Sequence, residues 1–463
     1  MKLFDAIANV FRIPDLRKRV LFTLAMLAVY RLGGHVPTPG VNLQRWNDFF
    51  TRNQGSIFGF FDLFAGGNIR RLTVFALGIM PYITASIILQ LLTVVVPTLE
   101  KLQKEGELGR RKITQWTRYL TVILALIQSF GIATGLEHGG VVNDPGIGFK
   151  LMTMVSLTTG TAFIMWLGEQ ITDRGIGNGM SLIIFAGIVV GLPGAIGNIY
   201  TNVFVTKEWS VITLAVILIM MIAVVAFIVL VERGERRIPV QYAKRVVGRR
   251  VMGGQSTHMP LKVNAGGVIP VIFASSILAF PQTLAGLPLV QNSPWLSGML
   301  GAIKHGEPLY VLLFVLGIIF FCFFYVSIIF NPNEAADNMR KYGGFIPGIR
   351  PGRNTAEYIN AILTKITVVG GIYLSILCMI PDIMIAGIHL QHLPLVGNWI
   401  DQYFPRFLLE GLNVQFYFGG TSLLIVVGVA MDTVNQIEAQ LIMRHYEGFT
   451  PRAGRIRGRR STF

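Results

Sequence analysis

The sequence contains few charged residues and few cysteines. Only 14% of its 463 residues are Asp, Glu, Lys or Arg, whereas soluble domains contain about 25%. The hydrophobic share of 52% and the mean hydropathy of +0.58 exclude a disordered or collagen-like chain. The two cysteines, Cys322 and Cys378, both stand in apolar runs. This excludes a disulfide-rich fold and favours two buried thiols.

Charged residues are nearly absent from a series of long stretches, each near the roughly 20 residues that a helix needs to cross a bilayer. We predict ten membrane spans, at about 20–36, 73–96, 117–135, 151–171, 179–197, 211–231, 266–286, 308–330, 362–382 and 412–434. The uncharged stretch 383–400 is broken by His389, His392 and Pro394, so we interpret it as an interfacial or re-entrant loop. The predicted fold class is an all-α polytopic membrane protein.

Lysine and arginine are divided unequally between the two sides of these spans. Of the 40, 31 fall in the N-terminal segment, in loops 97–118, 172–178, 232–265 and 331–365, and in the C-terminal tail. The positive-inside rule therefore places both termini in the cytoplasm. Residues 1–19 are predicted to form an amphipathic helix on the membrane surface, and 438–463 a basic tail. Topology alone explains such basic loops as well as partner binding does.

The sequence lacks the residues that ion-coupled transporters and ATP-driven enzymes use for their chemistry. Ion-coupled carriers keep ionisable residues deep in the membrane, whereas Arg31, Glu169 and Asp432 lie near span ends. The cytoplasmic loops contain no GxxxxGK[ST] motif for nucleotide phosphates. We therefore expect no enzymatic activity, no catalytic residues, no cofactor and no metal site, and we expect a partner to supply the energy for any work.

Two features of the sequence each allow two structural interpretations. The apolar piece Ile57–Ala65 is too short to span, and it is either a re-entrant segment buried in protein or an anchor on the outer leaflet. Polar residues within or beside the spans either form a functional cluster or serve as ordinary hydrogen bonds between helices. These residues are Gln90, Gln128, Ser275, Ser276 and Gln282.

Specific stretches along nearly the whole chain closely resemble the SecY family, the channel subunits of the bacterial Sec protein-translocation complex. They include YRLGGHVPTPG at 30–40, FALGIMPYITASIILQLLTVVVP at 75–97, KEGELGRRKITQWTRY at 104–119 and ITDRGIGNGMSLIIFAGIV at 171–189. Further along are RRIPVQYAKRVVGRR at 236–250, QSTHMPLKVNAGGVIPVIFASSI at 255–277, NPNEAADNMRKYGGFIPGIRPG at 331–352 and FYFGGTSLLIVVGVAMD at 416–432.

The resemblance implies ten helices in two inverted, pseudo-symmetric halves that open like a clamshell. The first half would be 20–197 with spans 1–5 and the plug 57–67. An external hinge loop would follow at 198–210. The second half would be 211–437 with spans 6–10 and cytoplasmic loops 232–265 and 331–365.

Functional residues carried over from the family fall into four groups. The apolar pore ring would be Ile79, Ile83, Met180, Ile184, Ile272 and Ile425, although core packing explains the same periodicity. The plug would be Ile57, Phe58, Phe60, Phe61, Leu63, Phe64, Ala65, Gly66 and Gly67. The lateral gate, between spans 2–3 and 7–8, would involve Thr84, Gln90, Gln128, Ser275, Ser276 and Phe280. The sites for motor or ribosome would be Arg249, Arg250 and Arg350.

The function implied is a channel that passes unfolded polypeptides across the cytoplasmic membrane and releases transmembrane segments sideways into lipid. Its implied partners are SecE-like and SecG-like small membrane subunits, the SecA motor ATPase, the ribosome through its RNA, signal sequences and membrane lipid. A ten-helix solute carrier or ion channel is disfavoured by the absence of buried charge and by the apolar ring. An insertase without a pore is the alternative that the sequence leaves open.

Overall fold

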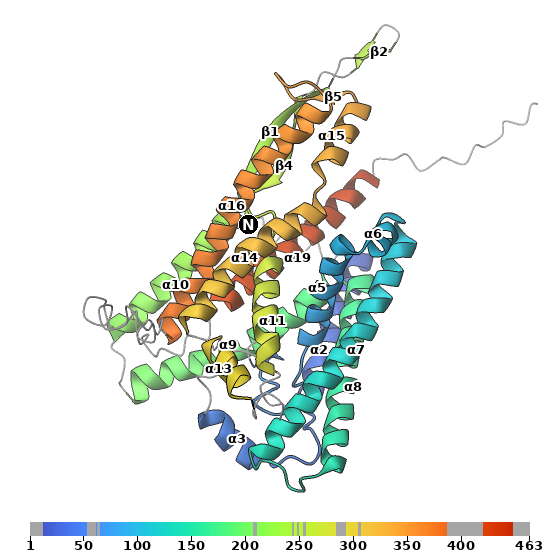
Figure 1. Cartoon of the computed structure of the whole chain (residues 1–463). Helices are drawn as coiled ribbons and strands as arrows, with labels where there is room; N and C mark the ends of the chain where they lie inside the picture. Colours follow the sequence, from blue (N-terminus) through green and yellow to red (C-terminus); the bar gives the residue numbers. More distant parts are fainter. Residues whose placement is uncertain are drawn as a thin grey trace, which may run out of the picture.

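A computed structural model describes residues 13–52, 62, 65–206, 211–242, 245–247, 250–252, 256–283, 293–303, 307–386 and 420–447. Long helices dominate this part of the chain (Figure 1). Several begin where a proline occupies the first turn, because proline has no N–H to leave unpaired there. These helix-starting prolines include Pro14, Pro97, Pro308 and Pro332.

The helices up to residue 205 form a first group. They are α2 (Pro14–Gly33), α3 (Leu43–Arg52), α5 (Met80–Val95), α6 (Pro97–Lys104), α7 (Glu107–His138), α8 (Ile147–Arg174), α9 (Gly179–Tyr200) and the π-helix η1 (Thr201–Val205). Contacts join α5 to α7, α7 to α8, α8 to α9 and α2 to α8.

The helices from residue 211 onward form a second group. They are α10 (Val211–Glu232), α11 (Ile269–Thr283), α13 (Pro294–Ala302), α14 (Pro308–Ile329), α15 (Pro332–Lys341), α16 (Arg353–Ala386) and α19 (Gly420–Glu447). Contacts join α11 to α14, α14 to α16 and α16 to α19. The two groups meet where α9 packs against α19, and where α11 packs against α5 and α7.

Strands from the two large loops form a small sheet. β1 (Glu235–Tyr242) pairs antiparallel with β4 (Ser256–Lys262) and with the short β5 (Gly344–Phe345), in the order β4-β1-β5. A separate hairpin joins β2 (Arg245–Val247) to β3 (Arg250–Met252). The sheet rests on an apolar cluster that includes Ile238, Leu261 and Ile359. Loops 232–265 and 331–365, which were predicted to lie on the same side, are thus joined.

Figure 1 places the sheet and α15 at the upper end of the view, α6 at the upper end of the group formed by α5, α7 and α8, and α3 near the lower end. This separation matches the predicted sidedness, because the sheet, α15 and α6 lie in basic loops and α3 lies between the first two predicted spans.

Each of the ten predicted spans overlaps a helix, with residues 284–286 of the seventh span and 412–419 of the tenth outside the described residues. Within the described residues, length and composition alone qualify five helical segments to cross a membrane, or six if α5 and α6, which bend by 100°, count as one span. The five are α7, α8, α14 together with α15 (Pro308–Lys341), and parts of α16 (Arg353–Met379) and α19 (Ser422–Leu441). Shorter apolar helical stretches lie in α9, α10 and α11. Cys322 and Cys378 are both buried thiols, as predicted.

The structure shifts several predicted boundaries. The helix of span 2 begins at Met80, not near residue 73, because turns that include Leu72 and Gly78 with positive φ precede it. Residues 14–19, predicted as part of a surface helix, belong to α2 and continue into the first span. Residues 1–12, 207–210 of the predicted hinge loop, 387–400 and the tail after 447 lie outside the described residues.

Candidate functional site

The predicted ring residues meet in one apolar cluster. Ile79, Ile83, Ile184, Ile272 and Ile425 are all buried in it. Ile79 directly precedes α5 and Ile83 lies on it, Ile184 lies on α9, Ile272 on α11 and Ile425 on α19. The cluster therefore joins helices from both groups where those groups meet.

Met180, the sixth predicted ring residue, lies at the edge of this cluster. Its side chain is half-buried and packs against the cluster. Its sulfur lies beside Gly168 of α8. The backbone N–H of Met180 donates a hydrogen bond to Asn178 Oδ1 at 3.1 Å, and this bond helps to fix the position of Met180. Asn178 thereby caps the start of α9, which also carries Ile184.

The predicted plug is described at its C-terminal end. Ile57, Phe58, Phe60, Phe61, Leu63 and Phe64 lie outside the described residues, whereas Ala65, Gly66 and Gly67 lie within them. Gly66 has φ +71, and a Cβ there would lie 2.7 Å from the Cα of Gly187 on α9. Only glycine allows both this conformation and this approach of two backbones.

Two side chains from the end of α2 hold this plug end. Tyr30 Oη donates to the carbonyl oxygen of Ala65 at 3.3 Å, and Arg31 donates to that of Gly66 at 3.3 Å. Asn68 Nδ2 in turn donates to Tyr30 Oη at 3.4 Å. No role was predicted for these residues, although YRLGG lies in one of the stretches that resemble the SecY family. Their hydrogen bonds span about 35 positions in sequence, and no local pattern predicts such contacts.

Asp62 braces the turn that follows the plug. Its Oδ1 accepts a hydrogen bond from the backbone N–H of Arg70 at 2.9 Å. Burial raises the pKa of the Asp62 carboxyl to about 6, although the N–H groups of Arg70 and Ile69 oppose this shift. Burial favours the neutral acid, and hydrogen bonds from backbone N–H groups favour the carboxylate.

At the predicted lateral gate, α11 packs against both α5 and α7. Three of its polar side chains bond within their own helices. Thr84 Oγ1 donates to the carbonyl oxygen of Met80 at 3.0 Å, Ser275 Oγ to that of Ile272 at 2.9 Å, and Gln90 Nε2 to Ser86 Oγ at 3.3 Å. Gln128 and Ser276 are buried. Phe280 lies on α11, and its side chain is outside the described part of the structure.

The predicted partner-binding arginines lie on or beside the two joined loops. Arg350 is exposed between β5 and α16, and its carbonyl oxygen accepts a hydrogen bond from Thr355 Oγ1 at 3.0 Å. Arg250 is the first residue of β3, and Arg249 lies outside the described residues. Because β5 pairs with β1, the segment that carries Arg350 begins at the three-stranded sheet.

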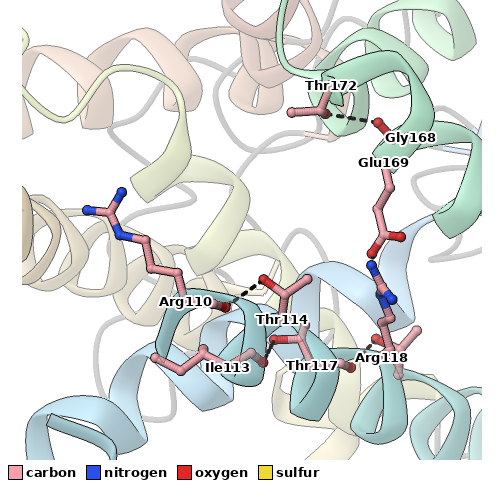
Figure 2. Close-up of polar contacts among 9 residues, drawn as sticks. Arg110, Ile113, Thr114, Thr117, Arg118, Gly168, Glu169 and Thr172 are labelled. Carbon is pink, nitrogen blue, oxygen red and sulfur yellow. Dashed lines mark hydrogen bonds and ion pairs between the residues drawn. The ribbon is translucent and has the colours of Figure 1, made fainter. Parts of the chain in front are cut away.

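Figure 2 shows how Glu169, one of the ionisable residues near a span end, is neutralised. Arg118 Nε on α7 lies 2.8 Å from Glu169 Oε1 on α8. Thr114 and Thr117 on α7, and Thr172 on α8, donate to carbonyl oxygens one helical turn earlier. The carboxylate therefore serves an interhelical ion pair, which ties α7 to α8 at the end of their spans.

Comparison with known proteins identifies the family. The sequence model of the SecY family matches residues 73–434. The chain belongs to the SecY family. Among its curated relatives is the protein translocase subunit SecY of Escherichia coli strain K12, which is 48% identical over 446 residues and covers 95% of each chain. Membership in the SecY family also makes this chain a multi-pass membrane protein.

Solved structures share the fold of this SecY-family chain at low identity. One is a SecY channel whose plug domain is described as stabilising the closed state and maintaining a membrane seal. It has a TM-score of 0.64, 17% identity, and coverage of 96% of this chain and 99% of the other. Another is Sec61 in a canine ribosome-channel complex, with a TM-score of 0.58, 17% identity and the same coverage. The complex with the ribosome is described for Sec61.

Proposed function

We propose that this SecY-family chain is the pore subunit of a protein translocase, and that an unfolded polypeptide crosses the membrane between its two halves. The observation that carries the proposal is the apolar cluster in which Ile79, Ile83, Ile184, Ile272 and Ile425 meet from both halves. Apolar side chains seal the resting channel by dewetting. They also fit around a chain of any sequence, because dispersion contacts have no preferred direction.

The plug fills the external side of this seal at rest. Support comes from its anchored end, where Tyr30 and Arg31 hold the backbone of residues 65 and 66. With its C-terminal end fixed, the remaining plug residues swing aside when a polypeptide enters, and they return afterwards.

Release into lipid occurs between α5 and α7 on one side and α11 and α14 on the other. The hydrogen bonds of Thr84, Ser275 and Gln90 within their own helices support this route. Separating the helices at that point breaks none of these three hydrogen bonds. A signal sequence or a transmembrane segment replaces the contacts between the helices as it enters the gap.

The energy comes from partners, and the chain itself is not an enzyme and holds no cofactor. The exposed Arg350 and the basic Arg249 and Arg250 suit the acidic surface of a motor ATPase such as SecA, or the phosphates of ribosomal RNA. SecE-like and SecG-like subunits complete the complex. The chain resides in the cytoplasmic (inner) membrane with both termini in the cytoplasm, as the unequal distribution of Lys and Arg supports.

The test is translocation by the purified complex in liposomes, with motor and ATP added outside. We expect a secretory precursor to become resistant to protease, and to become sensitive again after detergent lyses the vesicles. An insertase without a pore would integrate membrane proteins but would leave the secretory precursor fully sensitive. That result would contradict the proposal.

A further inference from the structure

A glycine-rich loop, residues 175–179, joins α8 to α9. Its backbone N–H groups donate hydrogen bonds to side chains of several helices. Ile176 N–H donates to Thr23 Oγ1 of α2 at 3.1 Å. Gly179 N–H donates to Thr172 Oγ1 of α8 at 2.9 Å. The same Thr172 hydroxyl donates to Gly168, as Figure 2 shows. The loop is therefore fixed to the first half of the protein at both of its ends.

The middle of this loop is bound to the second half. Gly177 N–H donates to Gln436 Oε1 of α19 at 3.1 Å, across 259 positions of sequence. Gly177 has φ +86, and a Cβ there would lie 2.9 Å from Leu182 and 3.3 Å from Thr433 Oγ1. The backbone of the first half thus approaches α19 closely at this point, in a conformation that favours glycine.

The other contact between the halves, between α11 and α5 with α7, is built differently. Where α11 meets α5 and α7, the hydroxyls of Thr84 and Ser275 and the amide of Gln90 all bond within their own helices. Parting those helices breaks none of these hydrogen bonds, whereas parting the Gly177 loop from α19 breaks one. The two contacts between the halves therefore differ: the hydrogen bonds of Thr84, Ser275 and Gln90 stay within single helices, whereas the bond from Gly177 to Gln436 joins the halves.

We propose that the contact of loop 175–179 with Gln436 and Thr433 is the cytoplasmic pivot of the two halves. The pivot keeps its geometry while the α5–α11 side opens. Gln436 is a positioning residue, since it holds the halves in register and touches no substrate. This inference rests on the proposed function, because a pivot has meaning only if the halves move apart during translocation.

The experiment compares two disulfides in the full complex. The pivot pair is Gly177→Cys with Thr433→Cys, positions that lie within reach of a disulfide. The gate pair is Thr84→Cys with Phe280→Cys. Each is oxidised to completion and assayed for precursor translocation before and after reduction. The single-cysteine variants control for strain at residue 177 and for the native Cys322 and Cys378.

We expect the oxidised pivot pair to translocate within about twofold of its reduced form, because a bridge across a contact that is identical in both states shifts no equilibrium. We expect the oxidised gate pair to stop and to recover on reduction. A pivot disulfide that stops translocation would overturn the inference, since it would show that α19 leaves the loop during opening. If the unmodified chain moved no precursor, the proposed function would be wrong and the pivot would fall with it.

A second measurement uses substitutions without cysteine. Gln436→Ala removes the acceptor, and Gln436→Glu keeps an acceptor oxygen at the same position. A pivot predicts that Gln436→Ala lowers the melting temperature of the complex, that Gln436→Glu restores it, and that neither admits precursors with defective signal sequences. Admission of such precursors by Gln436→Ala would instead identify a lock of the closed state, which contradicts the inference.

Discussion

Replacing Ile425 by asparagine is expected to loosen the resting seal. Ile425 is 0% exposed in the central cluster. The substitution removes roughly 1.5–3 kcal/mol of apolar burial, and an unpaired amide in the closed state costs a further ~1–3 kcal/mol. Because each ~1.4 kcal/mol changes a population tenfold, a closed state favoured by only a few kcal/mol shifts toward open by about tenfold or more.

Two assays read this shift. In cells, Ile425→Asn should export a precursor whose signal sequence is too weak for the unmodified chain, since the signal normally supplies part of the opening free energy. In planar bilayers, the resting complex should leak ions. Both effects should accompany normal abundance of the protein.

Two matched substitutions separate a seal residue from an ordinary apolar residue. Ile219 on α10 is 68% exposed in the isolated chain, and Ile359 on α16 is 0% exposed in the cluster beneath the sheet. Ile359→Asn should lower stability, and Ile219→Asn should disturb contact with lipid. Neither should admit weak signal sequences. If Ile425→Asn behaves as these two do in both assays, the ring assignment is refuted.

Three further predictions follow from the site. Arg350→Glu should impair motor-driven export more than membrane insertion, because the reversed charge repels an acidic partner surface; equal rates in both assays would count against it. The oxidised pair Thr84→Cys with Phe280→Cys should block translocation reversibly, and full activity of quantitatively bridged protein would exclude the lateral gate. Asp62, with a pKa raised from 3.8 to about 6, holds its proton more tightly in the folded state, so the melting temperature of the complex should fall as pH rises from about 4 to about 6 and should level off above that. Asp62→Asn should remove this step, and an unchanged pH profile would disprove it.

The sequence predicted the helical elements well because membrane spans leave a strong signal. All ten predicted spans overlap helices, and their ends agree best where proline or a charged residue stands, as at Pro308 and Glu232. The start of span 2 was misplaced because residues 73–79 are as apolar as a helix. The turns that interrupt them depend on Gly78 with φ +57, a conformation that hydropathy does not report.

Contacts distant in sequence were beyond prediction from the residues. The sheet that joins loops 232–265 and 331–365 was missed, although Ile238 and Val240 are buried and alternate with exposed residues in β1 as in a half-buried strand. The bonds from Tyr30 to Ala65 and from Gly177 to Gln436 depend on how whole helices pack. The ring residues were identified through family resemblance, because their spacing matches ordinary core packing equally well.

The most direct test of the central claim is to map the path of the polypeptide by photocrosslinking. A secretory precursor is arrested halfway through the purified complex, with a photoreactive residue at position 79, 184, 272 or 425 of the channel in turn, and at position 219 as the control. The account predicts strong crosslinks to the arrested chain from the four ring positions and none from position 219. Arrested precursor that crosslinks no ring position, while remaining protected in the vesicles, would show that the polypeptide takes another path and would contradict the account.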